Sequence, residues 1–125
     1  MFVGGGTGKT RVLLIEDESL VAMLIEEMLV DRGFDVVGVV SQLATGMQFA
    51  RDRTFDCAVL DVNLDGQYSY PIAEVLRARG IPFLFVTGYG SGGVEPEFKQ
   101  APVLAKPFTM ADLGAALERL TNPQR

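Results

Sequence analysis

The chain has 125 residues, of which 48% are hydrophobic and 22% charged, and this fits one ordinary globular domain. Its formal net charge of −5 disfavours direct binding to nucleic acid, and no apolar run reaches the roughly 18 residues of a membrane span. Histidine is absent, which excludes Ser-His-Asp and Cys-His catalysis, histidine-ligated zinc and a phosphohistidine on this chain. Because nothing at the N-terminus is typical of a secretory signal, we expect a cytoplasmic protein.

The first half of the chain alternates apolar strands with amphipathic helices. The predicted strands are Arg11–Ile15, Asp35–Val40 and Asp56–Leu60. A helix over about Ser19–Arg32 follows the first strand, with Gly33 at its C-terminal cap. Its spacing predicts a buried face made of Val21, Leu24, Ile25 and Met28. Ser41 is predicted to cap a second helix that runs to about Arg53, with Leu43, Met47 and Ala50 facing inward.

The middle of the chain continues the alternation after a predicted loop over Val62–Ser69. A third helix has Pro71 near its first turn and Gly80 after its end, the usual positions of these residues. The fourth strand is Phe83–Val86. The glycine-rich stretch Gly88–Gln100 can form at most a short, mobile helix.

The last elements are a short strand, Val103–Ala105, and a terminal helix. That helix begins at Thr109, whose spacing to Asp112 is typical of a capping box. Its predicted buried stripe is Leu113, Ala116, Leu117 and Leu120. The single cysteine, Cys57, lies in an apolar run and is predicted to be part of the core.

Five apolar strands alternating with helices predict an α/β fold with a doubly wound, five-stranded parallel sheet and helices on both faces. Right-handed crossovers favour the flavodoxin-like strand order 2-1-3-4-5, in which ligands bind beyond the carboxyl ends of the strands. We therefore expect a flexible leader over residues 1–10, one domain over residues 11–121 and a short tail over residues 122–125.

Polar side chains end four of the predicted strands. They are Glu16-Asp17, Asp61, Thr87 and Lys106. Strands one and three are predicted neighbours, and carboxylates held that close raise one another's pKa unless a cation neutralises them. Oxygen ligands without histidine or cysteine favour a hard cation such as Mg²⁺. A carboxylate at Asp61 between Mg²⁺ and the Lys106 ammonium would stay ionised and could attack phosphorus.

This set of residues, in this order, resembles the receiver domain of bacterial two-component response regulators, and the resemblance covers nearly all of Arg11–Leu120. It implies that Asp61 is the phosphoacceptor. It also implies that Asp17 and Asp61 bind Mg²⁺ directly, that Asn63 contributes its backbone carbonyl, and that Glu16 acts through water.

The same resemblance implies roles for the ends of the last two strands. The Thr87 hydroxyl would bind a phosphoryl oxygen, and a cis Lys106-Pro107 bond would direct the lysine to the site. The run Phe85–Tyr89 is similar to a Phe-x-Thr-Gly signature of single-domain receivers. Receivers commonly carry Tyr or Phe where this chain has Val103, so we expect Thr87 to act instead by drawing in the segment Gly88–Gly93.

The function implied is that of a phosphoacceptor that modifies only itself, and we do not class it as an enzyme. The phosphoryl group would come from a partner histidine kinase or histidine phosphotransfer protein. The few residues after Leu120 leave no room for an output domain, so a downstream protein partner is expected at the face formed by residues 88–120.

Several alternatives remain open. Taken singly, Asp17 could cap a helix and Thr87 could be an ordinary strand residue. An aspartyl-nucleophile phosphatase shares part of the pattern, although Asn63 stands where such enzymes need a second Asp. A flavodoxin-like module that binds a small ligand shares the fold. Tyr89, near the mouth of the site, either packs half-buried or shields the phosphoryl group from water.

The glycine-rich start, Val3–Thr10, partly matches a phosphate-binding P-loop. That motif needs glycine at the position of Val3, and it must follow a strand and open a helix. Here only two residues precede it and a strand is predicted to follow. We therefore interpret it as a leader.

Overall fold

The computed structural model describes residues 8–88 and 94–121. Its centre is a parallel five-stranded sheet with the order β2-β1-β3-β6-β7, which confirms the predicted doubly wound topology. The five strands are β1 (Arg11–Ile15), β2 (Asp35–Val40), β3 (Cys57–Asp61), β6 (Phe83–Thr87) and β7 (Val103–Ala105). The described residues also form four α-helices: α1 (Ser19–Asp31), α2 (Leu43–Asp52), α3 (Tyr70–Ala78) and α4 (Met110–Thr121).

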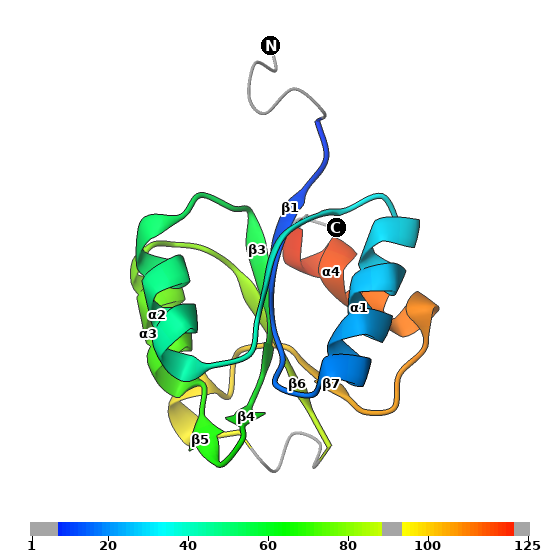
Figure 1. Cartoon of the computed structure of the whole chain (residues 1–125). Coiled ribbons are helices and arrows are strands. Elements are labelled where there is room, and N and C mark those ends of the chain that lie inside the picture. Colours follow the sequence, from blue (N-terminus) through cyan, green and yellow to red (C-terminus); the bar gives the residue numbers. More distant parts are fainter. Residues whose placement is uncertain (1–7, 89–93, 122–125) are drawn as a thin grey trace.

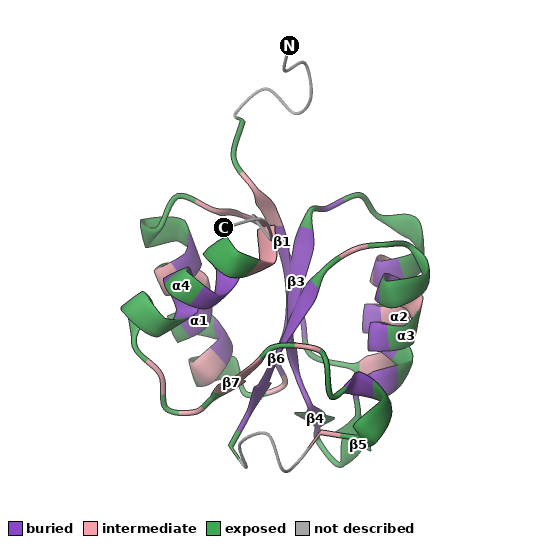
Figure 2. Cartoon of the chain, turned by 180° about the vertical axis from the view of Figure 1, so that it is seen from behind, coloured by how far each residue is buried: buried purple, intermediate pink, exposed green. Residues whose placement is uncertain are grey.

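Helices cover both faces of the sheet, with α1 and α4 on one side and α2 and α3 on the other (Figure 1). Successive residues of a strand point to opposite faces, so β1 contributes to two cores. Leu13 and Ile15 pack toward the α2–α3 side, and Val12 and Leu14 toward the α1–α4 side. The central strands β1, β3 and β6 are buried almost along their whole length (Figure 2), because helices shield both of their faces.

The helix ends follow the predicted sequence signals with one exception. Gly33 and Gly80 follow the first and third helices with positive φ angles of 89° and 72°. Thr109 and Asp112 form the predicted reciprocal capping box. The prediction that Ser41 caps the second helix is wrong: Gln42 holds the N-cap position in an extended conformation, without a side-chain hydrogen bond.

The buried face of α1 agrees only in part with the predicted one: Ile25 is buried as predicted, and Val21 and Met28 pack partly buried against the same core. Its buried residues are Ala22, Ile25 and Leu29, whereas Leu24 is 56% exposed. Because α1 carries apolar residues on almost every side, periodicity alone could not determine which side faces the sheet. In α4 the predicted stripe is correct, with Leu113, Ala116 and Leu117 buried; Leu120 packs at its margin.

Between β3 and α3 the predicted loop is instead a small β-hairpin. Its two strands, β4 (Asn63–Leu64) and β5 (Gln67–Tyr68), pair antiparallel. The Asp65-Gly66 dipeptide at its tip is a strong hairpin signal that the sequence already carried. In the second half of the chain, the predicted short helix is the single 3₁₀ turn η2 (Pro96–Phe98).

Within the described residues no helix is long and apolar enough to span a membrane. The strand β1 directly follows Thr10, as expected if the glycine-rich start is not a P-loop. Cys57 is fully buried at the start of β3, and burial raises the pKa of its thiol to about 12, which agrees with its predicted place in the core.

Candidate functional site

The carboxyl ends of β1, β3, β6 and β7 meet at one edge of the sheet. Asp61 is the last residue of β3 and lies opposite Val86 of β6. Thr87, the next residue of β6, lies opposite Ala105 of β7, and the N–H of Lys106 donates to the Thr87 carbonyl. Four segments far apart in the sequence are thus brought together by the parallel register, as the sequence predicts.

Three carboxylates form a tight group at this edge. Glu16, Asp17 and Asp61 each have a carboxylate oxygen within 4.8 Å of the other two. Glu16 and Asp61 are only 2% and 7% exposed. Asp17 is partly exposed. Such a group is unfavourable unless cations compensate for its charge.

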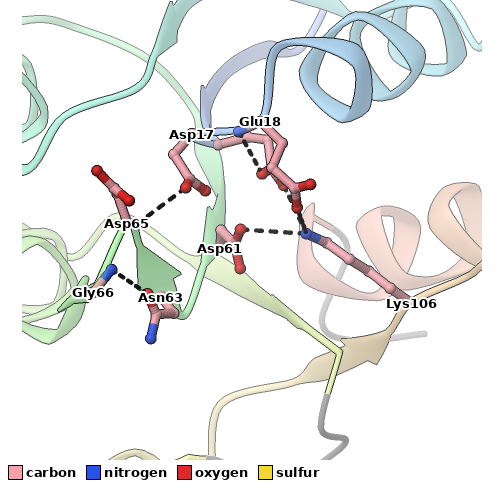
Figure 3. Close-up of polar contacts among 8 residues, drawn as sticks. Asp17, Glu18, Asp61, Asn63, Asp65, Gly66 and Lys106 are labelled. Atoms are coloured by element: carbon pink, nitrogen blue, oxygen red, sulfur yellow. Dashed lines mark hydrogen bonds and ion pairs between the residues drawn. The ribbon is translucent and has the colours of Figure 1, made fainter.

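The Lys106 ammonium supplies part of this compensation (Figure 3). Its Nζ lies 3.2 Å from Asp61 Oδ2 and 3.0 Å from Glu16 Oε1, and 3.9 Å from the exposed Glu18. One cation is therefore shared between two buried carboxylates. The Lys106-Pro107 peptide bond that follows is cis, as expected.

The pKa values reflect this shortage of positive charge. Burial is the main reason that the pKa of Glu16 rises to about 7, although the Glu18 N–H and Lys106 both favour its ionised form. Burial also raises the pKa of Asp61, against the opposing effects of Glu16 and Lys106. Burial lowers the pKa of Lys106, but the two carboxylates outweigh it and the net shift is upward. The lysine thus keeps its charge, and the pKa values of both buried acids lie above their ordinary range.

A divalent cation fits this donor set. The Glu16 Oε1 atom is completely buried, and the Lys106 ammonium that lies 3.0 Å from it is shared with Asp61. Three carboxylates converge, and all donors are oxygen atoms, which hard cations such as Mg²⁺ prefer. Charge, donor type and spacing all agree with a magnesium site.

Asp17 is held from the side by the hairpin. The backbone N–H of Asp65 donates to Asp17 Oδ2 at 3.1 Å, and Figure 3 shows the two side by side. Asp17 does not cap α1, since Glu18 is the N-cap residue and has no side-chain capping bond. The Asn63 side chain accepts a hydrogen bond from the Gly66 N–H at 2.7 Å, which leaves its backbone carbonyl as its possible metal donor.

Thr87 is 2% exposed and stands at the end of β6, one residue beyond the partner of Asp61. Tyr89 and the rest of the segment 89–93 lie outside the described residues, so the expectations for them remain predictions. Sequence reasoning missed the contact between Asp65 and Asp17. The Asp-Gly dipeptide could have indicated the hairpin, but not where its tip would lie.

Comparisons with known proteins give matches along most of the chain. The family model of the response regulator receiver domain matches residues 12–118. Among curated proteins, the phyllosphere-induced regulator PhyR of Methylorubrum extorquens is 30% identical over 116 residues, which are 88% of this chain and 43% of that protein. The chain spans about half the length of the curated relatives it matches, for example 55% of the Mycobacterium tuberculosis regulator PdtaR.

Solved structures agree with the sequence matches. The solution structure of SdrG from Sphingomonas melonis Fr1 is 43% identical, with a TM-score of 0.81 over 90% of this chain and 96% of that one. SdrG has also been solved in a BeF3-activated conformation. The receiver domain of the sensor histidine kinase PA1611 from Pseudomonas aeruginosa PAO1 is 27% identical, with a TM-score of 0.78 over 91% of this chain and 98% of that one, and holds a magnesium ion in its active-site cleft.

Proposed function

Because the chain belongs to the receiver domain family of two-component response regulators, we propose that it accepts a phosphoryl group on Asp61 and passes the signal to a protein partner. The observation that carries this proposal is the placement of Asp61 between the Lys106 ammonium and the carboxylates Glu16 and Asp17. These 125 residues contain no histidine, so the phosphoryl group would come from a histidine outside them.

The chemistry follows from the charges at the site. A carboxylate oxygen of Asp61 attacks phosphorus, the bond from phosphorus to its donor breaks, and an acyl phosphate forms. Lys106 pairs with the negative charge of the transferring group, and the Thr87 hydroxyl binds one of its oxygens. Mg²⁺, held by Asp17, Asp61 and the Asn63 carbonyl, with Glu16 acting through water, would neutralise charge on the carboxylates and the phosphoryl group.

The direct test is incubation with acetyl phosphate and Mg²⁺, followed by intact mass measurement. We expect one added phosphoryl group on the wild type, none on Asp61→Asn, and wild-type behaviour for Asp52→Asn, which removes an exposed acid of α2. An unmodified wild type would contradict the proposal. Steady hydrolysis of a phosphomonoester such as p-nitrophenyl phosphate would favour the phosphatase alternative instead.

The surface beside the site suits a protein phosphodonor. The outer side of α1 exposes four large apolar side chains: Leu20, Met23, Leu24 and Val30. A groove of about 370 Å³ runs between α1 and the segment Lys106–Phe108, so it shares Lys106 with the Asp61 site. A histidine kinase or phosphotransfer protein that delivers its phosphoryl group to Asp61 would cover this face and bury its apolar area.

A substitution on this face separates the chemistry from the docking. Leu24→Ser should leave labelling by acetyl phosphate unchanged and slow phosphotransfer from a phosphohistidine protein. If Leu24→Ser accepted the phosphoryl group from the phosphohistidine protein as fast as the wild type does, the donor would dock elsewhere. We propose that the downstream partner reads the face formed by residues 88–120 and that the protein acts in the cytoplasm.

A further inference from the structure

We infer that the β4–β5 hairpin is a positioning element of the magnesium site: its tip holds Asp17 through the backbone N–H of Asp65 and so presets a metal ligand. This inference rests on the proposed function, because it assigns to the hairpin a role in binding the Mg²⁺ that the phosphoryl transfer requires. Asp65 and Asp17 are 48 positions apart in the sequence and meet only through the fold.

The backbone of the tip is specific. Asp65 and Gly66 both have positive φ angles, 51° and 88°, the pattern of a type I′ turn joining two strands. A side chain at such an angle is unfavourable, and Asp65 is the only non-glycine residue in the described part of the chain that adopts one. This conformation directs the Asp65 N–H away from the hairpin ladder toward the Asp17 carboxylate.

The hairpin is braced at three points, so its tip cannot shift freely. The Asn63 side chain accepts the Gly66 N–H at 2.7 Å and closes the turn. Leu64 is 2% exposed and packs in the α2–α3 core. At the base, the Ser69 N–H donates to the Val62 carbonyl at 2.8 Å, directly after Asp61. The position of the tip is thereby fixed relative to β3.

Holding Asp17 has a clear consequence for metal binding. A free Asp17 side chain would rotate away from Glu16 and Asp61, since like charges repel. The N–H at the tip keeps the Asp17 carboxylate in the group and offsets part of its charge, and this bond uses only the Oδ2 atom. Mg²⁺ then meets ligands that are already gathered, and less conformational freedom is lost on binding.

The test measures Mg²⁺ affinity in variants that keep every proposed ligand atom. Asn63→Ala removes the side chain that accepts the Gly66 N–H but keeps the backbone carbonyl. Gly66→Ala makes the positive φ of the turn unfavourable without a steric clash, because an added Cβ meets nothing within 4 Å. Asp65→Gly is the control, because it keeps the N–H and favours the turn while removing the carboxylate. Dissociation constants come from Mg²⁺ titrations followed by NMR amide shifts, and urea midpoints in EDTA report folding separately.

Loss of one hydrogen bond to a charged acceptor predicts Mg²⁺ binding weaker by at least about five-fold in Asn63→Ala and Gly66→Ala. Asp65→Gly should stay within about two-fold of the wild type. Wild-type Mg²⁺ affinity in both Asn63→Ala and Gly66→Ala would overturn the inference. An equal loss of affinity in Asp65→Gly would also overturn it, because the effect would then belong to the Asp65 carboxylate. A wild type that binds no Mg²⁺ would instead overturn the proposed function together with this role.

Discussion

The hydroxyl of Tyr70, at the start of α3, accepts a hydrogen bond from the backbone N–H of Glu95 at 2.9 Å. The same tyrosine ring stacks on Phe98 at 5.3 Å and meets Phe85 of β6 edge-on. Arg77 adds an ion pair with Glu97 at 3.2 Å. The buried side chain of Tyr70 thus ties the segment around η2 to α3. In this protein β7 carries Val103 at the position where receivers commonly have the signalling aromatic residue.

Tyr70→Phe removes this hydroxyl and keeps the ring. We expect faster amide hydrogen exchange at Glu95 and its neighbours and a loss of about 1 kcal/mol in the free energy of unfolding, because a partly buried N–H loses its acceptor. Labelling of Asp61 by acetyl phosphate should not change. Tyr68→Phe, which keeps the Tyr70 hydroxyl in place, is the control, and equal exchange in the two variants would contradict the prediction.

Lys106→Met removes the cation shared by Glu16 and Asp61. Labelling of Asp61 by acetyl phosphate should slow by about ten-fold or more, the effect of roughly 1.4 kcal/mol on the barrier. Mg²⁺ should bind more tightly, because the lysine no longer competes for the same carboxylates. The two measurements move in opposite directions, which a general loss of structure would not produce. Lys99→Met, at an exposed position, should change neither quantity.

The metal-free protein should become less stable as the pH rises from about 4.5 to about 7. The folded protein raises the pKa of Glu16 from 4.5 to about 7, so in this range it binds more protons than the unfolded chain does. The free energy of unfolding then falls with rising pH, by about 2–3 kcal/mol across the range. Urea unfolding in EDTA measures the slope. Saturating Mg²⁺ and the variant Glu16→Gln should each reduce this dependence of the unfolding free energy on pH. An unchanged slope in Glu16→Gln would mean that other groups cause the dependence.

Two buried helix glycines should respond oppositely to alanine. A Cβ at Gly46 of α2 would lie 2.6 Å from Ile72 Cδ1 and 3.2 Å from Ile15 Cδ1, and both side chains are fully buried, so Gly46→Ala should cost about 1–3 kcal/mol. The atoms nearest to a Cβ at Gly114 of α4 belong to the guanidinium of Arg32, an exposed residue that can move. Gly114→Ala should therefore be neutral or stabilise by up to about 1 kcal/mol. Thermal or urea unfolding compares the pair.

Much of the fold could be predicted because the signals are local and consistent. Apolar strands, the glycines after the helices and the capping box at Thr109 each depend on neighbours in the sequence. Parallel strands then bring their ends together by topology alone, which is why Asp61, Lys106 and Glu16 could be grouped without coordinates.

The remaining features depend on tertiary packing. The orientation of α1 could not be determined, because Leu24 and Leu29 look alike in a helix that is apolar on nearly all sides, and only contact with the sheet separates them. The link between Asp65 and Asp17 depends on where a short hairpin points. The bond from Tyr70 to Glu95 joins side chain to backbone across 25 positions. Contacts of this kind leave no periodic pattern in the sequence.

Cys57 gives the protein a stability reporter of its own. Thiols react as thiolates, and this one is fully buried with its pKa raised to about 12, so alkylating reagents should modify it only when β3 leaves the sheet. The same strand carries Asp61 at its other end. One mass spectrum can then record both events on a single molecule, the phosphoryl group gained and the thiol modified. The alkylation rates of the phosphorylated and unphosphorylated molecules would show how far a phosphoryl group on Asp61 changes the opening of β3, without any engineered label.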